Sequence, residues 1–250
     1  MRAAIPNILT ASNLFCGCIA IIAISTGNII LTGVMLTVSL LADFLDGFVA
    51  RLLKVSSPIG KELDSLADMV TFGVVPGFIM GRLIQESMGR EFIPNVIWHP
   101  LTPEKPPLFL FGFILIILSA VRLARFNLDT RQSDRFIGVP TPANTIFIYS
   151  LWLIQYGYKD FWLTPLLENT WVLIGLTLVS SYWLIVELPL IALKFKNYSL
   201  KDNLFRYGLI LSCVLGVVIF GLKAIPFLFL LYILLSIIEP MVLKGGEDVS

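Results

Sequence analysis

The chain has 250 residues, of which 57% are hydrophobic and only 14% charged, and its mean hydropathy is +0.87. Soluble domains are about 45–50% apolar and about 25% charged, so this composition indicates an integral membrane protein. The formal net charge of +1 excludes a strongly basic surface for nucleic acid. We therefore expect the lipid bilayer as a partner, and no nucleic acid.

Several apolar stretches are long enough to cross a bilayer, because a spanning helix needs about 20 mainly apolar residues. They cover residues 8–26, 29–52, 62–85, 107–126, 141–158, 169–193, 204–222 and 224–243. Glycine, proline, serine and asparagine separate the first five stretches. The sequence predicts an all-α, polytopic membrane helix bundle of about eight transmembrane helices, with residues 1–250 forming a single domain.

Lysine and arginine are distributed unevenly between the two sides of this predicted bundle. If the N-terminus is cytoplasmic, 13 of the 18 basic residues lie on the cytoplasmic side. The five on the opposite side are Arg82, Arg90, Lys105, Lys159 and Lys223. The positive-inside rule then places both termini in the cytoplasm, and we expect a multi-pass protein of the cytoplasmic membrane.

The second and third predicted helices each carry a pair of aspartates. Asp43 and Asp46 are three residues apart on the second helix. Asp64 and Asp68 are four residues apart on the third, so each pair shares one face of its helix. The turn at residues 56–60 makes the two helices antiparallel neighbours. The sequence thus predicts a cluster of four carboxylates near the cytoplasmic side.

Arg51 and two glycines accompany these carboxylates. Arg51 lies five residues beyond Asp46, about 7–8 Å along the axis, so we expect a site sunk in the membrane but open to the cytosol. At the rim, Arg51 could pair with a phosphate. Gly47 costs about 1 kcal/mol in a helix relative to alanine, and its use would be a close approach of a nucleotide. Gly60 could do the same, or make the turn.

Carboxylates held together in a membrane need compensating positive charge. Each costs at least about 2.5–3.5 kcal/mol to insert, and the like charges repel one another. Divalent cations offset both the insertion cost and the repulsion between the carboxylates. Carboxylate oxygens favour Mg²⁺, Mn²⁺ or Ca²⁺ over zinc. We expect two ions, Mg²⁺ or Mn²⁺, clamping a diphosphate. The alternative is a set of structural or proton-relay carboxylates in an ion-coupled transporter.

Residues 43–68 match the pattern D-x2-D-G-x2-A-R-x8-G-x3-D-x3-D at every fixed position. Through this block the chain resembles the CDP-alcohol phosphotransferase family. The resemblance implies that a CDP-linked lipid such as CDP-diacylglycerol, or its ether-lipid analogue, binds as donor. It further implies that CMP leaves, that an alcohol hydroxyl accepts the phosphatidyl group, and that the protein is a homodimer of helical bundles.

The resemblance also implies a role for each residue of the block. The implied metal ligands are Asp43, Asp46 and Asp64. Asp68 would contact the metal site and act as general base on the alcohol, for which it needs only to be aimed at the hydroxyl as attack begins. The residues implied for the CDP pocket are Gly47, Arg51 and Gly60.

The start of the first predicted helix, Pro6-Asn-Ile-Leu-Thr-Ala-Ser-Asn13, also resembles the opening of the family. Thr10 and Asn13 are three residues apart and share one face, from which they could hydrogen-bond a nucleotide or a phosphate. The other interpretation is N-terminal capping together with polar contacts between helices.

Two further segments bear on the identity of the alcohol. Residues 122–127 end the fourth predicted helix and residues 136–144 open the fifth, and both resemble family members that transfer to L-serine. Arg122 and Arg125 share a face, and guanidinium groups suit the serine carboxylate or a lipid phosphate. The alternative is that these arginines only flank the cytoplasmic end of a membrane span, as the positive-inside rule leads one to expect. Glu187, in the sixth predicted span, is either structural or part of an acceptor cavity.

The leading interpretation is therefore a transferase that uses CDP-diacylglycerol and L-serine and releases CMP. The same chemistry with glycerol 3-phosphate or an inositol phosphate as acceptor would need a denser basic pocket. An ion-coupled transporter would tend to show inverted repeats and broken helices, and the sequence shows no visible repeat.

Overall fold

The computed structural model describes residues 4–55, 57–89, 107–128, 136–191, 199 and 203–245. These residues form helices joined by turns, with one short two-stranded bridge. In chain order the elements are α1 (Ala4–Ser25), α2 (Ile29–Leu53), α3 (Pro58–Met69), η1 (Val70–Val74), α4 (Val75–Ser87), η3 (Leu108–Phe111), α5 (Gly112–Leu128), β1 (Phe136–Ile137), α6 (Thr141–Gly157), α7 (Thr164–Leu167), α8 (Thr170–Ile185), β2 (Pro189–Leu190), α9 (Leu204–Phe220), η4 (Gly221–Ala224) and α10 (Ile225–Gly245).

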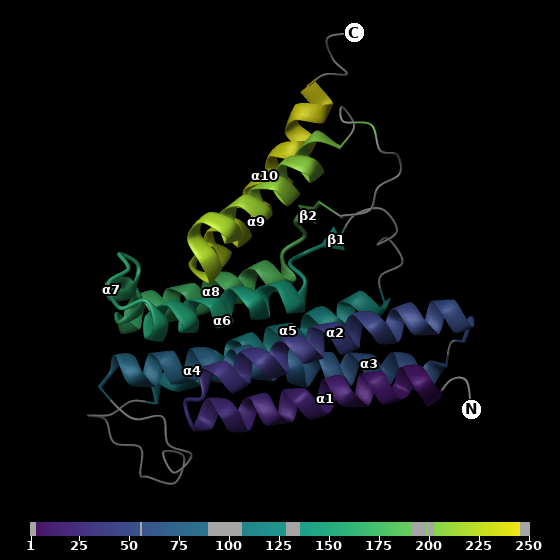
Figure 1. Cartoon of the computed structure of the whole chain (residues 1–250), viewed down its shortest axis with the longest axis horizontal. Helices are drawn as coiled ribbons and strands as arrows, with labels where there is room; N and C mark the ends of the chain where they lie inside the picture. Colours follow the sequence, from purple (N-terminus) through teal and green to yellow (C-terminus); the bar gives the residue numbers. More distant parts are fainter. Residues whose placement is uncertain are drawn as a thin grey trace.

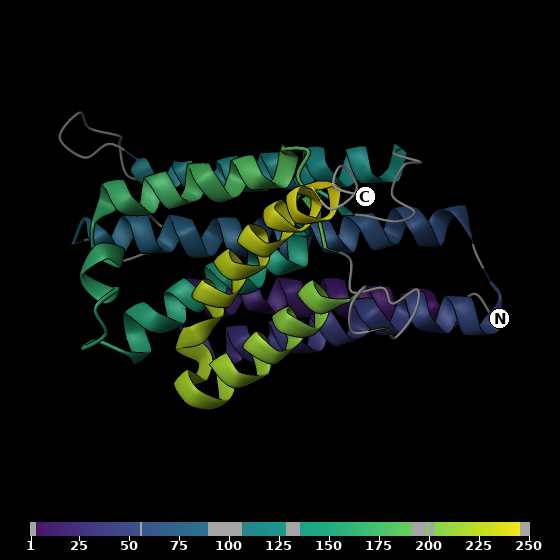
Figure 2. The ribbon, with the colours of Figure 1, turned by 90° about the horizontal axis from the view of Figure 1, so that it is seen from above.

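The helices form a bundle with an oblique hairpin attached to it. Figure 1 shows α1 to α5 lying along one another, with α3 and α4 forming one continuous rod through η1. The helices α6 and α8 lie against this group. In both Figure 1 and Figure 2, α9 and α10 run side by side at an angle to the rest. The arrangement confirms the predicted all-α helix bundle.

Five stretches of the described residues are long and apolar enough to cross a membrane by length and composition. They are Ala4–Ser25, Ile29–Leu53, Pro58–Ser87, Leu108–Leu128 and Leu204–Pro240. The last contains two of the predicted spans, and it folds back at η4, where Gly221 has a φ of +66°. The protein is therefore a multi-pass membrane protein.

The remaining predicted spans correspond to shorter helices. The spans at 141–158 and 169–193 coincide with α6 and α8, which have 17 and 16 residues. The count of eight spans and the side of the termini stay predictions. Arg131 and Arg135, which contribute to the charge bias, and residues 192–193 lie outside the described residues.

The prediction that a helix continues to residue 193 is wrong. The helix α8 ends at Ile185, and β2 then pairs antiparallel with β1. Pro189 disfavours a helical conformation at Leu188, whose carbonyl accepts the Gly138 N–H at 3.0 Å. Glu187 consequently lies exposed in this extended segment, and not within a helix.

A π-helical turn, η1, joins α3 to α4. Pro76, in the first turn of α4, has no N–H to donate to the Phe72 carbonyl, which would be its acceptor in an α-helix. The Val75 N–H instead bonds to the Val70 carbonyl. The Phe72 carbonyl accepts a 3.2 Å hydrogen bond from the Thr145 hydroxyl of α6. A neighbouring helix thus pairs the carbonyl that proline leaves free within a membrane span.

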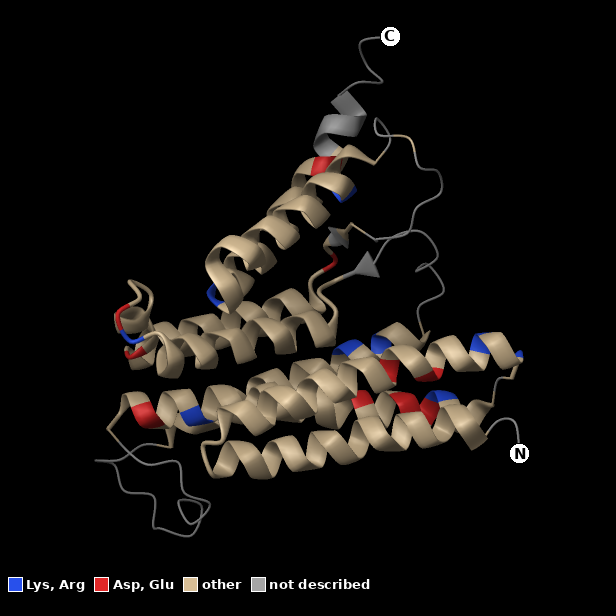
Figure 3. Cartoon of the chain, in the orientation of Figure 1, with Lys and Arg blue, Asp and Glu red and all other residues tan. Residues whose placement is uncertain are grey.

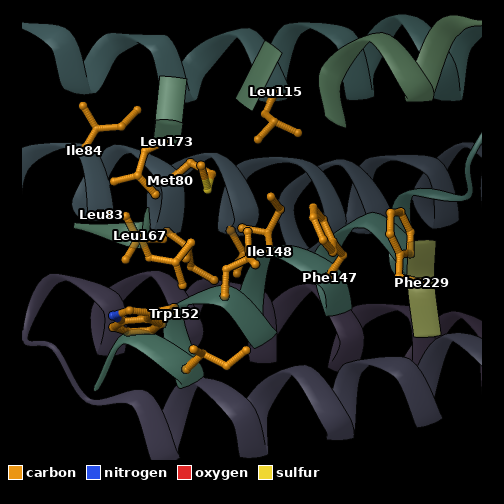
Figure 4. Packing of buried hydrophobic residues seen from close by; sticks show 14 of the residues in the cluster. Met80, Leu83, Ile84, Leu115, Phe147, Ile148, Trp152, Leu167, Leu173 and Phe229 are labelled. Atoms are coloured by element: carbon orange, nitrogen blue, oxygen red, sulfur yellow. The ribbon is translucent and has the colours of Figure 1, made fainter. Parts of the chain in front are cut away.

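Apolar side chains from four helices form the centre of the bundle. Figure 4 shows Ile148 and Trp152 of α6 among side chains of the other three helices, which include Met80 of α4, Leu115 of α5 and Leu173 of α8. Phe147 of α6 also stacks on Phe229 of α10, with 4.5 Å between the ring centroids. This packing fixes α6 between the rod formed by α3 and α4 and the oblique hairpin.

The bond between Thr145 and Phe72 predicts a measurable contribution to stability. Thr145→Val keeps the shape of the side chain but removes the donor, so the Phe72 carbonyl loses its partner on α6. We expect a destabilisation of about 1–2 kcal/mol, measured as a lower thermal unfolding midpoint of the purified protein in detergent.

Thr177→Val is the matched control for this measurement. Thr177 is equally buried, but its hydroxyl bonds only to the Leu173 carbonyl of its own helix. The Thr145 hydroxyl also lies 2.9 Å from the Thr141 carbonyl, so its single hydrogen is shared between a carbonyl of its own helix and that of Phe72. Equal destabilisation by the two variants would contradict the interhelical role of Thr145.

Candidate active site

The acidic residues of α2 and α3 gather at one end of the bundle. Figure 3 shows them close together at the end where the N-terminus lies. Lys54 ends α2 in a left-handed conformation, with a φ of 52°, and the Ser57 hydroxyl caps α3 by accepting the Gly60 N–H at 2.9 Å. Because α1 packs against both helices, it reaches the carboxylates of each.

Asp43, Asp64 and Asp68 form a compact group. Each offers a carboxylate oxygen, and these atoms all lie within 4.8 Å of one another. One Asp64 oxygen is buried and has no hydrogen-bond partner among the described residues. Ionised carboxylates only accept hydrogen bonds, so a cation between these three could compensate their mutual repulsion. Their oxygens fit a hard divalent ion.

Asp46 lies beside this group and has a partner on α1. Its side chain is buried, with 6% of its surface exposed, and its Oδ2 accepts a 2.5 Å hydrogen bond from Thr10. The Thr10 hydroxyl also lies 3.1 Å from the Pro6 carbonyl. The structure thus brings Asp46 and Thr10 together, as two predicted site residues from different helices.

Asn13 makes the corresponding contact with Asp68. Its Nδ2 donates to Asp68 Oδ1 at 3.1 Å, while its Oδ1 is buried without a partner among the described residues. Its backbone carbonyl accepts bonds from Ser39 and Thr71, each at 3.2 Å. Asn13 is therefore held from both α2 and η1, and its amide is fixed against Asp68.

A pocket of about 240 Å³ lies between α1, α2 and the start of α3. Its lining residues are Pro6, Asn7, Thr10, Asp46, Gly47, Ala50, Val55, Ser57, Gly60, Lys61 and Asp64. Asp64 belongs both to this wall and to the group of three carboxylates. The pocket therefore adjoins the group of three carboxylates.

Both predicted glycines lie where other helices or side chains come close. A Cβ on Gly60 would stand 2.9 Å from Ser57 Oγ and 3.0 Å from Asn7 Oδ1, which is too tight for an ordinary contact. A Cβ on Gly47 would stand 3.5 Å from the Arg51 guanidinium. Arg51 is exposed and its guanidinium lies near Gly47, but Arg51 itself is not among the residues that line the pocket.

The structure separates the two arginines predicted for the acceptor. Arg122 is buried, with 7% of its surface exposed, and it interacts electrostatically with Asp68. Arg125 is exposed, and its Nη1 lies 3.4 Å from the Ile185 carbonyl of α8. Of this predicted pair, Arg122 is the residue placed beside the carboxylates.

The sequence reasoning missed three of the polar or charged residues that line the pocket. Asn7 lies three residues before Thr10, so the same helical spacing that singles out Thr10 could have found it. Lys61 directly follows Gly60, and its Nζ lies 3.2 Å from the Asn127 carbonyl of α5. In the sequence, Ser57 was recognised only as part of the turn at residues 56–60. Lys61 adds a positive charge to a wall that otherwise carries aspartates.

Comparison with known proteins agrees with this geometry. Residues 3–183 match the family model described as CDP-alcohol phosphatidyltransferase. The CDP-diacylglycerol–serine O-phosphatidyltransferase of Helicobacter pylori is 30% identical over 239 residues, which cover 94% of this chain and 90% of that protein.

Two further relatives cover less of the chain. The protein of the same name from Bacillus subtilis is 32% identical over 138 residues, 55% of this chain and 69% of that protein. The archaetidylserine synthase of Methanothermobacter thermautotrophicus is 28% identical over 154 residues, 60% of this chain and 58% of that protein. The match to the family model spans the carboxylates, their α1 partners and the pocket, and the chain belongs to the CDP-alcohol phosphatidyltransferase family.

Proposed function

We propose that this protein transfers the phosphatidyl group from CDP-diacylglycerol, or its ether-lipid analogue, to the hydroxyl of L-serine and releases CMP. The observation that carries the proposal is the group of Asp43, Asp64 and Asp68 beside a pocket that Asp64 also lines. The names of the relatives from Helicobacter pylori and Bacillus subtilis supply the choice of serine.

The carboxylates have the chemistry of a divalent-metal site. Asp43, Asp64 and Asp68 would hold Mg²⁺ or Mn²⁺, with Asp46 as a further ligand on the pocket side. Two such ions would neutralise the diphosphate and stabilise the charge on the departing CMP. Thr10 orients Asp46 through their hydrogen bond, and it also lines the pocket.

The pocket residues would bind the CDP part of the donor. Gly47 and Gly60 both line the pocket, so the lack of a side chain at these positions leaves room for the nucleotide near the helix backbones. Lys61 in the wall and Arg51, whose guanidinium lies near Gly47, would pair with phosphate oxygens. The lipid tails then extend from this site along the apolar helix surfaces.

Asp68 is placed to act as the general base. The serine oxygen attacks the phosphorus that carries the diacylglycerol, a new P–O bond forms, and the P–O bond to CMP breaks. Asp68 accepts the proton of the serine hydroxyl as the attack begins. The bond from Asn13 Nδ2 to Asp68 Oδ1 fixes the orientation of this carboxylate.

Orientation and assembly follow from the same proposal. The site would face the cytosol, where serine and nucleotides are available, and the protein would lie in the cytoplasmic membrane with both termini inside. The family resemblance supports a homodimer. Glycerol 3-phosphate or an inositol phosphate is the second candidate acceptor, and membership of a transferase family disfavours a transporter.

The identity of the acceptor is tested directly by CMP release. Purified protein in lipid nanodiscs is supplied with CDP-diacylglycerol, Mg²⁺ and one alcohol at a time. We expect CMP with L-serine and none above background with glycerol 3-phosphate or inositol phosphate. CMP release with glycerol 3-phosphate alone would refute serine as acceptor, and no release with any alcohol would refute the transferase function.

Asp68→Asn tests the assignment of the general base. The amide keeps the size of the side chain but cannot accept the proton, so we expect kcat to fall by about 10²–10⁴-fold. Binding of CDP-diacylglycerol, measured by its effect on the thermal unfolding midpoint, should persist. The matched control is Glu62→Gln, because Glu62 is an exposed acid on the same helix. Loss of donor binding in Asp68→Asn would show that Asp68 is chiefly a metal ligand.

Metal removal tests the role of the carboxylates. Dialysis against EDTA should abolish CMP release, and Mg²⁺ or Mn²⁺ should restore it while Zn²⁺ does not, because hard oxygen ligands select the former ions. Asp43→Asn should raise the Mg²⁺ concentration needed for half-maximal rate. Full activity after exhaustive chelation would contradict metal dependence.

A further inference from the structure

Five polar side chains of α5, α6 and α8 are buried and incompletely paired. Each has less than a tenth of its surface exposed. The atoms without a hydrogen-bond partner among the described residues are Ser119 Oγ, Arg122 Nε, Thr141 Oγ1, both amide atoms of Asn144, and Ser181 Oγ. Unpaired polar groups cost free energy when buried, so their concentration in one region points to a polar ligand.

The contacts of α5 and α6 place these side chains level with Asp68. A Cβ on Gly73 would stand 3.1 Å from Ser119 Cβ, and Arg122, one turn further along α5, interacts electrostatically with Asp68. On α6, Thr145 bonds to the Phe72 carbonyl, one turn beyond Asp68. The helix α6 begins near the end of the bundle that holds the carboxylates and runs away from it (Figure 1). Its first turn therefore lies nearer to Asp68 than Thr145 does.

The helix α8 brings the fifth side chain to the same level. Arg125 lies 3.4 Å from the Ile185 carbonyl, and α5 and α8 run in the same direction (Figures 1 and 2). One turn earlier on each helix, Arg122 and Ser181 therefore lie at similar height. Thr141 and Asn144 share a face of α6, being three residues apart.

The chemistry of this set matches a small zwitterion. The Arg122 guanidinium suits a carboxylate. The amide oxygen of Asn144 and the hydroxyls of Thr141 and Ser181 are acceptors for an ammonium group. A dianionic phosphate would call for further cations, whereas Arg125 is exposed and directed at a backbone carbonyl.

We propose that Arg122, Asn144, Thr141 and Ser181 form the subsite that binds the carboxylate and ammonium groups of the amino-acid acceptor and points its hydroxyl at Asp68. Asn144 contributes most to binding the ammonium group, because neither of its amide atoms has another partner among the described residues. This inference rests on the proposed transfer to serine. It adds the residues that distinguish serine from other alcohols.

The test compares isosteric variants of buried amides in the nanodisc assay. Asn144→Leu should raise the KM for L-serine by at least about tenfold, while the KM for CDP-diacylglycerol stays unchanged. Gln85→Met is the matched control, because Gln85 is a buried amide with an unpaired oxygen on α4, in the part of the span beyond η1. Ser181→Ala should raise the serine KM, whereas Ser180→Ala should not, because the Ser180 hydroxyl bonds within α8.

Two serine analogues show which residue binds the carboxylate and which binds the ammonium group. Ethanolamine lacks the carboxylate and 3-hydroxypropionate lacks the ammonium group, and each is measured as a competitive inhibitor against serine. Arg122→Ala should weaken inhibition by 3-hydroxypropionate and leave inhibition by ethanolamine unchanged. Asn144→Leu should do the reverse. A purely structural defect would weaken both inhibitors alike, and that pattern would overturn the proposal.

Failure of the subsite and failure of the proposed function give different results. If the wild type releases CMP with serine but Asn144→Leu leaves the serine KM unchanged, the subsite is wrong and the function stands. If the wild type releases CMP only with another alcohol, both are wrong. If no alcohol yields CMP, the function is wrong, and binding of radiolabelled L-serine to wild type and Asn144→Leu decides the subsite.

Discussion

The structure depends on the burial of carboxylates in helices that are otherwise apolar. Two bonds from α1 compensate part of this burial, from Thr10 to Asp46 and from Asn13 to Asp68. Each joins α1 to a different helix, so the packing of three helices and the positions of the acids are set together. The oxygens of Asp43, Asp64 and Asp68 lie close enough together to hold a divalent cation, and the proposed binding of metal-bound phosphates rests on this group.

The sequence predicted the parts of this site that depend on local spacing. Asp43 to Asp68 lie on two successive helices, where intervals of three and four residues decide which side chains share a face, and Thr10 and Asn13 follow the same rule. The helical class was equally accessible, because long apolar stretches leave few alternatives in a membrane. The family pattern added roles that spacing alone does not give.

Features that depend on long-range packing were not accessible in this way. Glu187 lies in a stretch that reads as apolar and helical, yet Pro189 and the pairing of β2 with β1 end the helix before it. Arg122 and Arg125 look equivalent in sequence, and only the neighbouring helix α8 separates them into a buried and an exposed residue. Asn144 and Ser181 become notable only once their burial and missing partners are known.

Pro76 has a consequence for the order in which this protein assembles. Its missing N–H leaves the Phe72 carbonyl dependent on Thr145, which lies more than seventy residues later in the chain. During synthesis the segment Pro58–Ser87 therefore enters the membrane before its partner exists. The polar carbonyl stays without that donor until α6 arrives, and the docking of α6 then supplies a hydrogen bond to the backbone of the continuous rod that carries Asp68.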